Sequence, residues 1–123
     1  MRLKPNFTGT ANTIQAYDQG YIIVNEQRIR HSVIVTPERL ITGWPPQRFA
    51  ELQAVHLELL LELEPEIVLL GTGARQYFPH PRLTSPLLSR GVGVEVMDTP
   101  AACRTYNFLM AEGRRVAAAL LII

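Results

Sequence analysis

The segment with the strongest chemical signal is "GTGARQ", residues 71–76, which follows the apolar run "IVLL". Glycines at the end of a strand can aim several backbone N–H groups at an anion and let it approach closely. The segment has two of the three glycines of a dinucleotide-binding fingerprint, with Gln76 in the third place. That fingerprint needs a helix directly after the turn, and the prolines of "YFPHP" prevent one there. A Walker loop is excluded because no Gly-Lys-Ser/Thr follows.

A weaker binding site is still compatible with this turn. Gly71–Gly73 and Asp98–Thr99 each follow a predicted strand, and ligands collect at the carboxyl edge of parallel strands. We therefore expect the two segments to lie side by side. The side chains expected to project into the same region are Arg75, Gln76, Arg104 and Asn107.

Two interpretations of this corner stay open. In one, the amides of Gly71, Thr72 and Gly73 bind a small anion or metabolite together with Arg75 and Arg104. In the other, the glycines only turn the chain, and Arg75 pairs with Asp98 or with a carbonyl group.

The residues that could act in catalysis or bind a metal are few. Cys103 is the only cysteine and lies in the first turn of a predicted helix, where it is either a reactive thiol or a small buried apolar residue. The three histidines, His31, His56 and His80, lack metal-ligand spacing. We therefore predict no catalytic residue, no metal site and no cofactor.

Trp44 is the only tryptophan and precedes two prolines. An aromatic residue beside a rigid turn can be a hot spot for contact with a partner. It can equally cap the core with its indole N–H at the rim. Both interpretations stay open.

Periodicity predicts a single α/β domain over 15–123. Residues 1–14 are expected to form a flexible N-terminal arm, and the first twenty residues as a whole to be loosely held. Residues 21–24 and 32–35 are expected to form an antiparallel hairpin around Asn25 and Glu26. The second half reads strand–helix–strand–helix–strand, which makes parallel neighbours. The sum is a mixed sheet with helices packed on it. The expected strands are 21–24, 32–35, 38–44, 67–71, 92–98 and 116–123, and the expected helices are 49–64, 82–91 and 98–112.

Composition limits the partners of the chain. Its 123 residues carry a formal net charge of +1, which gives no electrostatic reason to expect a nucleic acid or an anionic membrane. No apolar run is long enough to cross a bilayer, and "MRLKPNFTGT" is not a signal peptide. We expect a cytoplasmic protein. Association between copies is left open, because the apolar strand 116–123 could lie inside the sheet or at its edge.

Two blocks of the sequence, "LLGTGARQYF" and "VEVMDTPAACRTYNFLMAEGRRVAAALL", resemble the Mth938-like family of domains of unknown function. That family includes mitochondrial complex I assembly factor 3 and the adipogenesis-associated Mth938 domain-containing proteins. The order of "VIVTP", a tryptophan, a helix and the glycine turn also agrees. The positions that match the signature blocks are Gly71, Thr72, Gly73, Arg75, Asp98, Cys103, Arg104, Tyr106 and Asn107.

The resemblance implies a compact layered β/α domain with no established enzymatic activity. It also implies action through protein contacts, since the eukaryotic members are assembly helpers. We therefore predict a non-enzymatic interaction or assembly module that docks through the signature region and Trp44, with a membrane or respiratory complex as a candidate target. The alternative is the domain that binds an anion or metabolite at the glycine turn.

Overall fold

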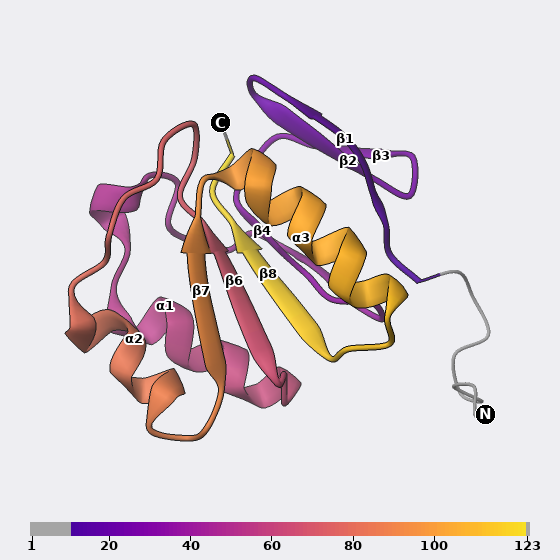
Figure 1. The fold of residues 1–123 in the computed structure, drawn as a ribbon. Coiled ribbons are helices and arrows are strands. Elements are labelled where there is room, and N and C mark those ends of the chain that lie inside the picture. The colour runs from indigo at the N-terminus through magenta and orange to yellow at the C-terminus, as the bar shows by residue number, and fades with distance from the viewer. Residues whose placement is uncertain (1–10, 123) are drawn as a thin grey trace.

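The main sheet has five strands in the order β5-β4-β8-β6-β7, seen face on in the computed structural model (Figure 1), which describes residues 11–122. Strands β6, β7 and β8 run parallel, and β4 is antiparallel to β5 and β8. A separate antiparallel sheet has the order β1-β2-β3. The strands are β1 Ile14–Asp18, β2 Tyr21–Val24, β3 Gln27–Ile29, β4 Val33–Val35, β5 Leu40–Thr42, β6 Ile67–Gly71, β7 Gly93–Met97 and β8 Val116–Leu120. The α-helices are α1 Ala54–Glu58, α2 Pro81–Leu88 and α3 Thr99–Ala111, and the 3-10 helices are η1 Phe49–Glu51 and η2 Leu59–Leu63.

Strand β8 lies at the centre of the main sheet and is buried on both faces. Val116, Ala118 and Leu120 join the core under α3 and the small sheet, whereas Ala117 and Ala119 join the core under α1 and α2. An uninterrupted apolar run is what a strand covered on both faces requires. The position of β8 decides the question left open above: this strand is interior and not an edge.

The two cores explain the layered architecture. Helix α3 and the three-stranded sheet cover one face of the main sheet, and α1 and α2 cover the other (Figure 1). This arrangement confirms the predicted mixed α/β fold with an N-terminal hairpin and a C-terminal βαβαβ part.

The hairpin is real, but its second strand was predicted wrongly. Asn25 and Glu26 form its turn with φ values of 46° and 73°, as two-residue turns of this kind require. β2 pairs with β3 (Gln27–Ile29), and the predicted partner strand is β4 of the other sheet. The residue before β1 stabilises this turn, because Thr13 N donates to Asn25 Oδ1 over 2.9 Å.

The predicted N-terminal arm lies partly outside the described residues, because these begin at residue 11. The prediction of a loosely held segment is wrong for Ile14–Asp18, which form β1. Ile14 is buried, and Asn12 N donates to Pro37 O over 2.9 Å. The chain is therefore already bound to the domain at these positions.

The helix predicted over 49–64 is divided. Its regular part, α1, begins at Ala54 because Gln53 and His56 form a capping box, with Gln53 N donating to His56 Nδ1 over 2.9 Å. The helical segment continues as the 3-10 helix η2 and ends at Glu64, immediately before Pro65. Glu64 has a left-handed φ of 52°. Val55, within α1, is 57% exposed.

Candidate functional site

The glycine turn and the start of α3 lie side by side, as the topology predicted. Thr72 N donates to Met97 O over 2.9 Å, and Thr99 N donates to Gly73 O over 2.8 Å. Gly73 N in turn donates to the hydroxyl of Thr99 over 2.8 Å. The loop after β6 and the cap after β7 are thus joined by a short hydrogen-bonded seam.

The seam is filled by protein groups. Thr99 is fully buried, and its hydroxyl also donates to Leu121 O over 2.6 Å. Asp98 caps α3 by accepting from Ala101 N over 2.8 Å, so a carboxylate already occupies this helix N-terminus. The Gly73 amide points at Thr99 and a negative charge stands at the helix start, so this geometry does not favour the anion-binding alternative.

The loop beyond the turn is closed by the Thr72 hydroxyl. This oxygen accepts from Tyr77 N over 3.1 Å and donates to Arg75 O over 2.5 Å. The loop carries Arg75 outward to an exposed position. The expected pairing of Arg75 with Asp98 is absent from the hydrogen bonds and salt bridges formed within residues 11–122. Gln76 instead returns to the sheet, where its Nε2 donates to Val96 O over 3.0 Å.

Arg104 and Asn107 were expected to project into the glycine corner, and the structure places their contacts elsewhere. Arg104 Nη1 donates to the Tyr17 hydroxyl over 2.9 Å, and this bond raises the pKa of Arg104. Asn107 accepts from Ile14 N over 2.9 Å and donates to Ile14 O over 2.7 Å. Both side chains hold β1 against α3, a role that no local sequence signal reveals.

Cys103 lies in the interior of the domain. Its side chain is fully buried in the core under α3, and this burial raises the pKa of the thiol to about 12, despite the nearby charge of Arg104. A nucleophilic cysteine needs a lowered pKa and access to solvent. The structure therefore favours the packing role over the reactive thiol.

We expect iodoacetamide at pH 8 to modify Cys103 in the folded chain about 1,000-fold more slowly than in the chain unfolded in guanidinium. The reason is that a pKa near 12, against an ordinary value of 9.0, lowers the thiolate fraction by about three powers of ten. Mass spectrometry over time measures both rates. Equal rates in the two states would show that the thiol is accessible.

Trp44 belongs to the core of the α1 and α2 face. It is only 2% exposed, and its Nε1 donates to His56 O over 3.1 Å. The structure thus favours the core-capping interpretation, and the proposed docking role of Trp44 is not supported in this conformation. Sequence reasoning also missed the capping role of His56 and that of His80, whose Nδ1 accepts from Arg82 N at the start of α2.

A pocket of about 390 Å³ lies next to the glycine turn. Phe49 and Tyr77 stack beside it, with ring centroids 5.1 Å apart. Tyr77 is 43% exposed, and Phe78, next in the loop, is 80% exposed. Of the predicted site residues, Thr72 and Gly73 line this pocket, together with Gln47, Arg48, Phe49, Ala50, Tyr77, Leu121 and Ile122.

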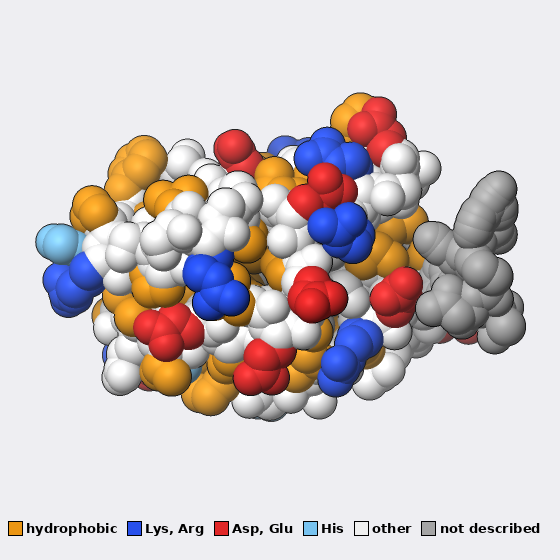
Figure 2. Space-filling model, turned by 90° about the horizontal axis from the view of Figure 1, so that it is seen from below, with side chains coloured by type: hydrophobic (Ala, Val, Ile, Leu, Met, Phe, Trp, Pro, Cys, Tyr) orange, Lys and Arg blue, Asp and Glu red, His pale blue; other side chains and the backbone are white. Residues whose placement is uncertain are grey.

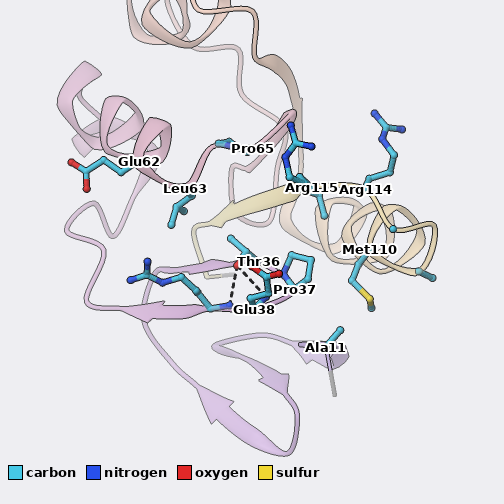
Figure 3. Close-up of a pocket in the computed structure, with 14 residues that line it drawn as sticks. Ala11, Thr36, Pro37, Glu38, Glu62, Leu63, Pro65, Met110, Arg114 and Arg115 are labelled. Carbon is cyan, nitrogen blue, oxygen red and sulfur yellow. Dashed lines mark hydrogen bonds between the residues drawn. The ribbon is translucent and has the colours of Figure 1, made fainter. Parts of the chain in front are cut away.

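A second pocket of about 450 Å³ lies near the amino ends of β6 and β8, at the other end of these strands from the glycine turn (Figure 3). The sequence analysis did not predict it. Leu63, Pro65 and Met110 give it apolar walls, and Arg114 and Arg115 stand at its side. Arg114 Nε is bound to Glu66 Oε1 over 3.2 Å. Viewed from below Figure 1, the surface carries a mixture of acidic, basic and apolar side chains (Figure 2). None of the predicted site residues lines this pocket.

Comparison with known proteins decides the family. The family model described as "Protein of unknown function (DUF498/DUF598)" matches residues 14–121. The chain belongs to this family. Members with solved structures share its fold. A Bordetella parapertussis protein has 50% identity and a TM-score of 0.89, and the match covers 94% of this chain and 99% of that one. A Bordetella pertussis protein, a Mth938-like domain, has 41% identity and a TM-score of 0.83, covering 99% and 92%. The resemblance to Mth938-like domains is thus confirmed.

A curated member of the family has a name that refers to assembly. NADH dehydrogenase [ubiquinone] 1 alpha subcomplex assembly factor 3 of Bos taurus is 36% identical over 110 residues. The match covers 88% of this chain and 59% of the bovine protein, so the chain spans about three fifths of that relative's length. Among the described residues, no helix has both the length and the apolar character needed to cross a membrane.

Proposed function

We propose that this chain is a non-enzymatic protein-interaction module that helps a multisubunit complex to assemble. The observation that carries the proposal is the 36% identity with a relative named as an assembly factor. A membrane or respiratory complex is the class of target that this relative suggests. The match covers 59% of the relative's length, so a partner of this class is part of the proposal for this chain.

We assign docking to the loop formed by residues 74–78. It exposes Arg75, Tyr77 and Phe78 to solvent, and arginine and tyrosine are enriched among residues that dominate interface energies. The Thr72 hydroxyl and the seam with Thr99 fix the base of the loop. A loop held in one conformation loses less entropy when it binds, which favours affinity.

The proposal is tested by affinity purification of the tagged chain from its native host after brief crosslinking. We expect Arg75→Glu and Phe78→Asp each to reduce the recovery of the main partner at least about tenfold. The first reverses a charge in the contact surface, and the second replaces an apolar ring there by a charged group. Arg90→Glu, an exposed arginine in the turn after α2, is the matched control. Circular dichroism confirms that each variant is folded.

Two results would contradict the proposal. One is that the wild-type chain recovers no partner above an unrelated domain of the same size. The other is that Arg75→Glu and Phe78→Asp recover as much partner as Arg90→Glu does.

A further inference from the structure

One edge of the main sheet is open to another strand. Strand β7 is the last in the order β5-β4-β8-β6-β7 and lies at the outer left of the sheet in Figure 1. Within residues 11–122 it pairs only with β6. At five residues it is longer than β5, the three-residue strand at the opposite edge. An unpaired strand edge presents N–H and C=O groups that can receive a further strand.

The hydrogen bonds of β7 show which groups face outward. Gly93 N donates to Glu66 O over 3.0 Å, and Met97 O accepts from Thr72 N over 2.9 Å. The odd-numbered residues of β7 therefore turn their backbone groups toward β6. Val94 and Val96 turn theirs away from β6.

Within residues 11–122, one side chain forms a hydrogen bond to this outer edge. Gln76 Nε2 donates to Val96 O over 3.0 Å and so occupies one outward carbonyl. The amides of Val94 and Val96 and the carbonyl of Val94 have no backbone partner within residues 11–122. Three outward groups on a five-residue strand can thus receive an antiparallel segment, and a fourth becomes free when Gln76 moves.

Glu95 discriminates between the possible occupants. Its side chain is exposed, between the two outward valines. If two copies of the chain paired through β7, the register that joins Val94 to Val96 of the second copy would place Glu95 directly opposite its own counterpart. Like charges directly opposite one another across a strand pair are destabilising, and opposite charges are favourable. In this register the edge is therefore unsuited to a second copy, and it is suited to a strand with a basic residue at its centre.

We propose that β7 receives an extended segment of a partner protein as an added antiparallel strand, with a lysine or arginine opposite Glu95. This inference rests on the proposed function and specifies its partner. The added strand lies beside the loop 74–78, because Gln76 of that loop contacts Val96. One partner can thus engage both surfaces.

The pairing is tested with the purified full chain and two synthetic peptides, Thr-Val-Thr-Arg-Thr-Val-Thr and the same sequence with glutamate at its centre. In ¹⁵N NMR titrations we expect the arginine peptide to shift the amide signals of Val94 and Val96. It is expected to bind about tenfold more tightly than the glutamate peptide, because an opposite-charge pair replaces a like-charge pair. Glu95→Lys is expected to reverse the preference. Glu62→Lys, an exposed glutamate on η2, is the control and leaves it unchanged. Unmoved Val94 and Val96 signals at millimolar peptide, or equal binding of both peptides, would overturn the inference.

A second measurement needs no peptide. Because Glu95 opposes self-pairing, we expect Glu95→Val to form dimers in sedimentation experiments at concentrations where the wild-type chain and Glu62→Val are monomers. A wild-type dimer held through β7, or a Glu95→Val variant that stays monomeric, would contradict the role given to this residue. Both measurements use the isolated chain, so a failed search for a host partner leaves them unaffected.

Discussion

Replacing Trp44 with alanine is expected to lower the free energy of unfolding by about 4 kcal/mol, the range typical for loss of a buried tryptophan. The indole is 2% exposed in the core under α1 and α2, and its N–H satisfies the carbonyl of His56. The substitution leaves a cavity and removes this bond. Urea unfolding followed by circular dichroism measures the change.

Phe78→Ala is the matched control for Trp44, because it removes an aromatic ring that is 80% exposed. We expect it to change stability by less than about 0.5 kcal/mol, as surface substitutions usually do. A Trp44→Ala variant as stable as this control would show that Trp44 is a surface residue, and the docking role first considered for it would return.

Gly71→Ala is expected to lower the free energy of unfolding by about 3 kcal/mol, at the upper end of the usual cost of overpacking. An added Cβ would lie 2.9 Å from Thr99 Oγ1, 3.0 Å from Leu120 Cδ2 and 3.1 Å from Thr99 Cα. The last of these is a backbone atom in the seam that joins β6 to α3, so it cannot move aside without breaking that seam. Urea unfolding is again the measurement.

Gly93→Ala, in the neighbouring strand, is the control for Gly71. Its Cβ would meet no atom closer than 3.6 Å, an ordinary contact, so we expect a change of less than about 1 kcal/mol. Equal effects of the two substitutions would indicate a general cost of alanine in these strands. They would then give no support to a close approach between Gly71 and Thr99.

The second half of the fold was predictable because its elements are strongly marked. The continuous apolar runs at Ile67–Gly71 and Val116–Leu120 are strands covered on both faces. Asp98 and Pro100 mark the start of α3, and Gly113 follows its end. Parallel connectivity then brings the carboxyl ends of β6 and β7 together, and this is why the proximity of Gly73 and Thr99 could be predicted.

Two strands of the small sheet, β1 and β3, could not be predicted, because they carry polar side chains. β3 contains Gln27 and Arg28, both exposed, and only Ile29 is buried. In β1 likewise only Ile14 is buried, and it is held by two hydrogen bonds with Asn107, 93 residues away. No local period reveals a strand that is stabilised by a contact so distant in the sequence.

The chemistry of the corner also depends on contacts that the sequence does not show. Thr72 and Thr99 looked like ordinary residues of a turn and a cap, yet their hydroxyls close the loop and the seam. Arg104 and Asn107 point to β1 because of how α3 is rotated on the sheet. That rotation is set by the packing of Ala102, Cys103 and Tyr106 in the core.

The central position of β8 has a consequence for how a nascent chain folds. Strand β4 is formed by residues 33–35 and strand β6 by residues 67–71, and they become neighbours only through residues 116–120. Until β8 has been synthesised, β4 and β6 each have an unpaired edge on the side that β8 later occupies. Pairings so remote along the polypeptide are slow to form. Protection by a chaperone during synthesis would therefore benefit this fold more than one assembled from adjacent hairpins.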